Sequence, residues 1–186
     1  MSLLLAGSGE KFTLQEVADT AQIALGSISF RFGSKDGLIR ATLVYALDRL
    51  MTEEHIMVQQ ALAGTRGLEA YVVRYVGDFA DFLRTRGPIL RVVMRRSGTD
   101  KVMADRGRHA TRAGAELATT ALLEYQDEFG GRRPRVKAET AFHVIFATLA
   151  RQLGLNTLGT PAHFQDFADV KVELARMTVA YLKSRY

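Results

Sequence analysis

The chain has 186 residues, of which 47% are hydrophobic and only 3 are proline, so it can form one compact unit, or a small head and a larger body, from long helices. It contains no cysteine, which excludes disulfides and thiolate metal sites and agrees with a reducing cytoplasm. The net charge is +5, and neither a signal peptide nor a membrane-spanning apolar run is apparent, so we expect a soluble cytoplasmic protein with no membrane partner.

Residues 12–38 (FTLQEVADTAQIALGSISFRFGSKDGL) predict two short helices, a tight turn and the capped start of a third helix. Thr13 and Glu16 have the spacing of a capping box, in which each side chain accepts a hydrogen bond from the other residue's backbone N–H. An inward stripe with helical spacing follows, formed by Leu14, Val17, Ala18 and Ala21. Ile23 is expected to pack in the turn.

The second short helix is anchored by Ile28 and Phe32, which lie four residues apart and can share the same small core. Ser34 is expected to cap the next helix, with Asp36 in its first turn, where the helix dipole favours a carboxylate. The outward face of the second short helix carries Leu25, Gly26, Ser27, Ser29, Phe30 and Arg31.

This segment resembles the DNA-binding head of the TetR family of transcriptional regulators. The matching positions are, in chain order, Thr13-Leu14-x-x-Val17-Ala18, Ala21-x-Ile23, Gly26-Ser27-Ile28, Phe32 and Gly33-Ser34-Lys35-Asp36-x-Leu38. The resemblance covers about a seventh of the chain. It implies an all-α protein with an N-terminal helix-turn-helix DNA-binding head in residues 1–50 and a helical ligand-binding and dimerisation domain in residues 51–186.

The chain departs from the family pattern in two ways. Relatives carry a full amphipathic helix before the motif, whereas a Gly-Ser-Gly run interrupts residues 1–11, so we expect a short or truncated first helix. In addition, Leu25 stands where a basic or polar residue is common, and Ser29 where an aromatic residue is common. Two functions therefore stay open: a DNA-binding regulator, and a TetR-like ligand-binding or interaction protein that has lost DNA binding.

Six further helices are predicted after residue 33. The first runs from Ser34 to about residue 63, with a candidate break near Thr52. The Gly87-Pro88 pair is expected to end the second helix, which starts near residue 68, and to begin the third, which ends near residue 97. The remaining helices are expected at about 99–129, 135–153 and 161–185.

The last two helices carry more apolar surface than packing on a single core requires. We therefore predict that they pair with those of a second copy in a two-fold, four-helix interface, which the resemblance also implies. A monomer whose core wraps both helices is the alternative. The predicted dimer-interface residues are Phe142, Ile145, Leu149, Phe167, Val170, Leu174, Met177 and Tyr181.

A mostly apolar ligand cavity is predicted inside the body. Our hypothesis is that a small-molecule effector binds one conformation of the body preferentially, that the helix beginning at Ser34 then moves, and that the separation of the two heads no longer fits DNA. The same stripe of aromatic residues would also suit an ordinary core. The predicted lining consists of Tyr71, Tyr75, Phe79, Phe82, Met94, Met103, Phe142, His143 and Phe146.

A dimer would present two copies of the second short helix to successive major grooves of DNA, roughly 34–36 Å apart. Ser27, Ser29 and Arg31 are the expected base readers, and an apolar contact with a thymine methyl is open to Leu25. The polar groups expected at phosphates are those of Thr13, Gln15 and Lys35. With Gly26 and Phe30 these residues form the predicted DNA-binding set: Thr13, Gln15, Leu25, Gly26, Ser27, Ser29, Phe30, Arg31 and Lys35.

The positive charge lies away from the head. Residues 1–50 hold five basic and five acidic groups, whereas residues 84–112 hold nine Lys or Arg residues against Asp100 and Asp105, a net charge of +7. This basic stretch can be a solvated helix face, a surface beside DNA phosphates, or a site for an anionic ligand. The sequence does not choose among the three.

We do not expect an enzyme. The chain has no H-E-x-x-H or G-x-S-x-G motif, and its histidines, His55, His109, His143 and His163, show no paired metal-ligand spacing. No metal or cofactor is therefore expected. The sequence predicts a ligand-responsive transcriptional regulator, expected to be a repressor, that binds a near-palindromic operator in double-stranded DNA as a homodimer and is released by a small molecule.

Overall fold

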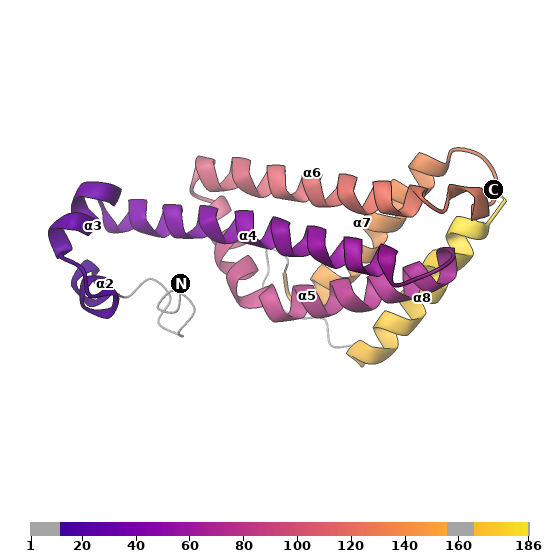
Figure 1. Cartoon of the computed structure of the whole chain (residues 1–186), viewed down its shortest axis with the longest axis horizontal. Helices are drawn as coiled ribbons and strands as arrows, with labels where there is room; N and C mark the ends of the chain where they lie inside the picture. Colours follow the sequence, from indigo (N-terminus) through magenta and orange to yellow (C-terminus); the bar gives the residue numbers. More distant parts are fainter. Residues whose placement is uncertain (1–11, 156–165, 186) are drawn as a thin grey trace.

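The structure, a computed structural model, describes residues 12–155 and 166–185. These residues form seven α-helices and one short 3-10 helix and contain no strand, which confirms the predicted all-α fold (Figure 1). The prediction for residues 1–11 and the expected start of the last helix near residue 161 lie outside the described residues. In the labels of Figure 1 the elements are α2 (Leu14–Ala21), α3 (Leu25–Phe32), α4 (Lys35–Ala63), α5 (Leu68–Ser97), α6 (Lys101–Leu123), the 3-10 helix Gln126–Glu128, α7 (Pro134–Gln152) and α8 (Phe167–Lys183).

The head consists of α2, α3 and the first turns of α4. The predicted capping box is present: the Thr13 hydroxyl accepts from the backbone N of Glu16 at 3.1 Å, and the Glu16 carboxylate accepts from the backbone N of Thr13 at 2.6 Å. Ala18 and Ile28 are both 1% exposed, so the two short helices share a core as expected. The predicted packing of Ile23 in the turn is wrong, because its side chain is 49% exposed.

The helix α4 links the head to the body without interruption, so the predicted break near Thr52 is wrong. The Thr52 hydroxyl donates to the carbonyl oxygen of Asp48 at 3.1 Å, one turn earlier, and this local bond leaves the backbone helical. The expected domain boundary at residue 50 therefore falls inside one continuous helix.

The Gly87-Pro88 pair also lies inside a helix, so the expected division into two helices is wrong. Pro88 cannot donate the backbone hydrogen bond of its position, but Leu83 and Ile89 on either side of it are buried, and this packing keeps α5 continuous. The direction of α5 changes in its second half, as expected for a proline inside a helix (Figure 1).

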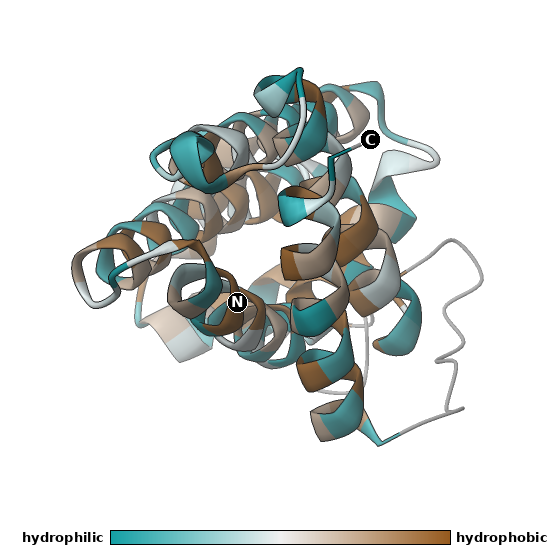
Figure 2. Cartoon of the chain, turned by 90° about the vertical axis from the view of Figure 1, so that its right-hand side faces the viewer, coloured by the Kyte–Doolittle hydropathy of each residue, from teal (hydrophilic) through white to brown (hydrophobic). Residues whose placement is uncertain are grey.

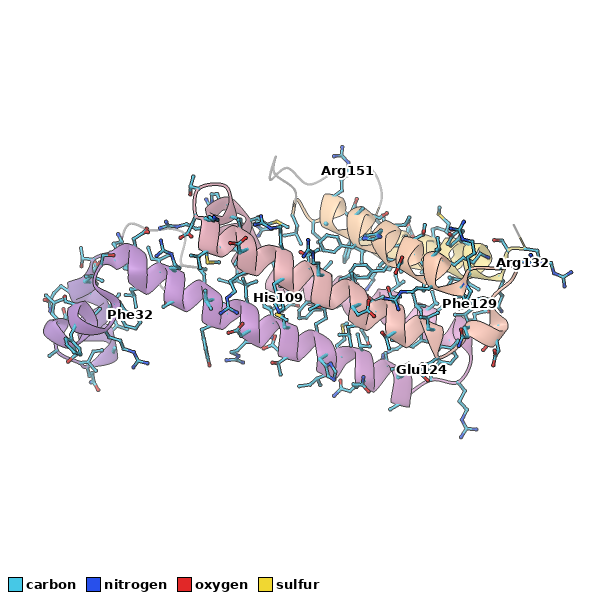
Figure 3. The ribbon with its side chains drawn as sticks, turned by 90° about the horizontal axis from the view of Figure 1, so that it is seen from above. Phe32, His109, Glu124, Phe129, Arg132 and Arg151 are labelled. Carbon is cyan, nitrogen blue, oxygen red and sulfur yellow. The ribbon has the colours of Figure 1, made fainter. Side chains whose placement is uncertain are left out.

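In the body, α5 is the central helix and packs against α4, α6, α7 and α8. The helices α4 and α6 run side by side over much of their length (Figures 1 and 3). Figure 2 shows hydrophobic and hydrophilic stripes along the helices, as expected for amphipathic helices around one core. This core includes fully buried side chains of several helices, among them Val58, Tyr71, Tyr75, Leu122, Ile145 and Leu149.

A second core cluster joins the head side of α4 to the α5–α6 turn. Phe12, Ile39 and Leu43 meet Val93 of α5 and Met103 of α6, which is 0% exposed. The first turns of α4 are therefore packed against the body as well as against the head. A movement of α5 or α6 at this place acts directly on the helix that carries the head.

The C-terminal end of α8 is held by a buried cation. Lys137 of α7 is 5% exposed, and its Nζ donates to the carbonyl oxygens of Gly130 at 2.8 Å, Leu182 at 3.1 Å and Ser184 at 2.5 Å. A positive charge at this end of a helix satisfies unpaired carbonyls and interacts favourably with the helix dipole. Lys137 thus fixes α8 against α7 and the loop before it.

Candidate DNA-binding surface and ligand cavity

The outward face of α3 forms one end of the elongated molecule (Figure 1). All the residues of the predicted DNA-binding set except Lys35 are exposed, and Phe30 is 95% exposed. Ile23 and Leu25 of the same head are exposed as well, at 49% and 39%. Figure 3 labels Phe32 in this head, far from Arg132 at the opposite end of the molecule.

The charged groups of the head differ in how they are held. The Arg31 guanidinium makes no ion pair within the described residues and lies 5.6 Å from the centroid of the Phe32 ring. Lys35 is half-buried, with its ammonium 4.7 Å from the centroid of the Phe12 ring. The backbone N–H of Thr13 lowers the pKa of Glu16, so this carboxylate stays engaged in the helix cap. Arg31 is thus the most available cation on the α3 surface.

Two ion pairs connect the α5–α6 turn with the start of α4. Arg96 lies 2.7 Å from Asp36, and Arg40 lies 2.7 Å from Asp100. The hydrogen bond from Arg40 lowers the pKa of Asp100, which also caps α6 by accepting from the backbone N of Val102 at 2.9 Å. We call these two pairs the α4 latch. It ties the first turns of the head-bearing helix to the end of α5 and the start of α6.

A cavity of about 1390 Å³ opens between α4, α5 and α6, with α7 on one side. It exceeds the range of about 300–1,000 Å³ that is usual for small-molecule sites. Aromatic rings form part of its wall. The ring centroid of Phe79 lies 6.3 Å from that of Phe82 and 6.2 Å from that of Phe142, and the centroids of Phe142 and Phe146 lie 6.1 Å apart. Ser97 and Gly98, next to the α4 latch, line the same cavity.

The structure places only part of the predicted lining at this cavity. Phe79, Phe82, Met94, Phe142 and Phe146 line it. The other predicted lining residues do not: Tyr71, Tyr75 and Met103 are 0% exposed members of the core, and His143 is exposed on the outer side of α7. The aromatic stripe of α5 is thus core at its first two positions and cavity wall at its last two, because α4, α6 and α7 close over only one end of it.

Sequence reasoning missed Glu54 of α4, which lines the cavity as a partly buried carboxylate. Burial raises the pKa of Glu54 to about 7. Opposite it stands Gly114 of α6, where an added Cβ would lie 2.9 Å from the Glu54 Oε1 atom. The sequence contained one signal for this burial: Glu54 lies four residues from both Leu50 and Val58, which are buried, and so shares their face of the helix.

Cations surround the outer part of the cavity. Arg91, Arg95, Arg108 and Arg112 line it and are all exposed. Among them, Arg108 pairs with Asp105, and Arg91 donates to the carbonyl oxygen of Leu153 at 3.4 Å. Other cations of the basic stretch 84–112 pair with acids outside it, as Arg86 does with Glu53 at 2.9 Å. The charge surplus of this stretch is therefore divided between ion pairs that hold the body together and an exposed rim around the cavity.

Most of the predicted dimer-interface residues are buried within a single chain. Phe142, Ile145, Leu149, Val170 and Leu174 are between 0% and 7% exposed, so they belong to the core and offer no surface to a second copy. Met177 and Tyr181 are 63% and 38% exposed, and Phe167 is half-buried. The large apolar side chains that are exposed on α7 and α8 are those of Val136, Val144, Val172, Met177 and Tyr181. We call these five the outer α7–α8 face.

The described residues contain no cluster of three or more His, Cys, Asp or Glu side chains that could hold a metal ion, and His163 lies outside them. Among these same residues, no helix is long and apolar enough to cross a membrane.

No family model matches the chain, and no curated protein matches it in sequence. Solved structures do. A transcriptional regulator from Cytophaga hutchinsonii is similar with a TM-score of 0.69 and 17% identity, over 97% of this chain and 93% of that one. The TetR family transcriptional regulator PfmR from Thermus thermophilus is similar with a TM-score of 0.60 and 11% identity, over 100% of this chain and 96% of that one. The chain therefore has the all-α, TetR-like fold that these regulators share.

Proposed function

We propose that the protein is a ligand-responsive transcriptional regulator that binds operator DNA as a homodimer through α3. The observation that carries this proposal is the exposed α3 face at the far end of α4, on a fold shared with known regulators. It presents hydroxyls, one unpaired guanidinium and an uncovered aromatic ring on a single short helix. These are the groups that read base edges and thymine methyls in a major groove.

In this proposal Arg31, Ser27 and Ser29 contact base edges, and Leu25 or Phe30 contacts thymine methyls. Phosphates are held by the groups around the start of α2, where Thr13 and Gln15 are exposed. A dimer reads two half-sites about 34–36 Å apart, so the operator is near-palindromic.

The dimer is proposed to form through the outer α7–α8 face. This face carries medium and large apolar side chains that a single chain leaves uncovered, and one self-complementary patch suffices for a two-fold dimer. Five of the eight residues that the sequence pattern assigned to the interface are buried in the core of a single chain, so the proposed interface is smaller than that pattern predicted.

The switch is proposed to run from the cavity through the α4 latch. Ser97 and Gly98 line the cavity, and the neighbouring Arg96 holds Asp36 in the first turn of α4. A ligand that binds one arrangement of the α5–α6 turn more tightly shifts the position of α4 and so the separation of the two heads. We propose that this releases the DNA, which makes the protein a repressor.

The experiment is a gel shift against duplex DNA from the region flanking the gene, at about 50 mM and about 200 mM salt. We expect a footprint with two-fold symmetry. Arg31→Ala should weaken binding about tenfold or more. Arg132→Ala, at the opposite end of the molecule, is the matched control and should bind as the unchanged protein does. If the protein binds no DNA duplex of any sequence at about 50 mM salt, the proposal is contradicted.

A second function is supported by the surface of the head around α3, which is poor in charge and rich in exposed apolar groups. Ile23, Leu25 and Phe30 are 49%, 39% and 95% exposed, and the head carries no net charge. Such a surface also suits a protein partner. In that case Phe30→Ala and Arg31→Ala would leave weak, nonspecific DNA binding unchanged, and ligand binding in the cavity would persist without any operator.

A further inference from the structure

We propose that the cavity takes a ligand with a protonated amine on a largely apolar or aromatic frame, and that the Glu54 carboxylate receives the amine. This inference rests on the proposed function, because it names the chemical class of the effector. It starts from a carboxylate that lies in an apolar cavity and lacks a cationic partner.

Glu54 makes no hydrogen bond or ion pair with any side chain of the described residues. Its neighbour Glu53 is paired with Arg86 at 2.9 Å, so the two adjacent carboxylates differ sharply in their surroundings. The pKa of Glu54 is raised to about 7 by burial, and no arginine of the cavity rim offsets that rise. A buried carboxylate without a partner is unfavourable, and a ligand cation would relieve this cost.

The Glu54 carboxylate packs directly against a glycine of the neighbouring helix α6. Any side chain at position 114 would reach the Glu54 carboxylate, because an ideal Cβ there lies 2.9 Å from Oε1 and 3.1 Å from Oε2. The nearby tyrosines do not partner the carboxylate either, since the hydroxyls of Tyr71 and Tyr75 are buried without any hydrogen bond. The Glu54 carboxylate therefore has no polar side chain as a partner, and Glu54 lines the cavity.

The remaining wall suits the rest of such a ligand. The rings of Phe79, Phe82, Phe142 and Phe146 line the cavity, and the centroids of the rings that pair lie 6.1–6.5 Å apart. Aromatic faces attract cations electrostatically and pack against apolar frames. A protonated amine with an aromatic or aliphatic body therefore matches both the carboxylate and the wall.

An anionic ligand is the competing class, because four arginines line the outer part of the cavity. Their side chains are exposed, so solvent screens them more strongly than it screens Glu54. An anion drawn inward from the rim would lie in the same cavity as the unpaired carboxylate, and like charges in a low dielectric repel. The geometry therefore favours the amine.

The test uses isothermal titration calorimetry on the full chain at pH 8 with three probes of equal length: 6-phenylhexylamine, 6-phenylhexanol and 6-phenylhexanoate. We expect the amine to bind at least tenfold more tightly than the other two. Glu54→Gln should weaken amine binding at least tenfold and leave alcohol binding unchanged. Glu124→Gln, which changes an exposed carboxylate at the end of α6, is the control and should change neither.

The affinity for the amine should also rise about tenfold between pH 6 and pH 8, as Glu54 ionises. Tyr75 of α5 interacts electrostatically with Glu54, and burial raises the pKa of Tyr75 well above its usual value, so Tyr75 stays neutral over this range. The Glu54 carboxylate also packs against Gly114 of α6, which carries no titratable group. The rim arginines Arg91, Arg95, Arg108 and Arg112 share the cavity, and arginine keeps its charge over this range.

The inference is overturned if the amine does not bind, if Glu54→Gln leaves amine affinity unchanged, or if the carboxylate probe binds best and loses affinity in Arg95→Ala or Arg112→Ala. The gel shift without ligand tests the proposed function separately. DNA binding without amine binding refutes the ligand class alone. Amine binding through Glu54 without DNA binding supports the site and refutes the regulator.

Discussion

Replacing Glu54 by Gln should stabilise the protein in a pH-dependent way. Gln has nearly the same shape as Glu but cannot ionise, so it removes the cost of holding a charged carboxylate in the cavity. The rise in the pKa of Glu54 from 4.5 to about 7 corresponds to about 3 kcal/mol of the free energy of unfolding when both folded and unfolded states are ionised.

The direction of the effect follows from the order in which the two states lose the proton. As the pH rises through 4.5, the unfolded chain ionises at Glu54 first, while the folded chain keeps its proton up to about pH 7. The stability that this group contributes is thus fully present below pH 4.5 and is lost as the pH rises through 7. The advantage of Glu54→Gln over the unchanged protein should grow by about 2 kcal/mol between pH 5.5 and pH 8.

The assay is urea unfolding followed by far-UV circular dichroism at both pH values, with protein concentration held constant because the proposed dimer couples stability to concentration. The measured quantity is the difference in free energy of unfolding between Glu54→Gln and the unchanged protein, compared at the two pH values. The Gln amide itself changes this difference by the same amount at both pH values, so only its change with pH reports on the carboxylate. Glu124→Gln should show no such change. A difference between Glu54→Gln and the unchanged protein that stays constant with pH would mean that the carboxylate is solvated or already paired, and the reasoning about the cavity would fail.

Three further changes test other parts of the molecule. Lys137→Met should lower the free energy of unfolding by about 3 kcal/mol, because several α8 carbonyls lose a charged donor, and a loss below about 1 kcal/mol in urea unfolding would contradict that role. Met177→Asp should convert the dimer to a monomer in analytical ultracentrifugation. Val102→Asp changes an exposed apolar position on α6 and should leave the dimer intact. Equal molecular masses for the two variants would exclude the outer α7–α8 face as the dimer interface. Arg96→Ala should preserve DNA binding but reduce the ligand-induced loss of the gel shift severalfold, while Arg106→Ala, a weaker α6–α4 pair at 3.9 Å, should respond like the unchanged protein. An unaltered response of Arg96→Ala would exclude the α4 latch as the route of coupling.

Features that depend on neighbouring residues in the sequence could be predicted closely. The capping box at Thr13 and the Ser34 cap form as expected, with the Ser34 hydroxyl accepting from the backbone N of Gly37 at 3.1 Å. Each of these interactions closes within one helical turn, so the sequence pattern contains both partners. For the same reason the outward residues of α3 were assigned to the surface correctly.

Predictions that required a partner from another helix were less successful. Gly87-Pro88 is a strong local signal for a helix boundary, yet burial of the residues around it keeps α5 intact. In α7 and α8 the periodic apolar residues were assigned to a dimer interface, but Ile145 and Leu174 face α5 and the core of their own chain. The amphipathic pattern reveals that a face is buried and not which chain buries it.

The sequence by itself determined the all-α fold, most of the helix ends and the exposed surface of α3, because helix periodicity and capping are encoded within a few consecutive residues. Only the tertiary structure decided where the cavity lies, which aromatic residues line it, and that Glu54 faces it opposite Gly114 of another helix. These depend on how α4, α5 and α6 pack together, and a carboxylate in a helical pattern looks the same in sequence whether water or an apolar wall surrounds it.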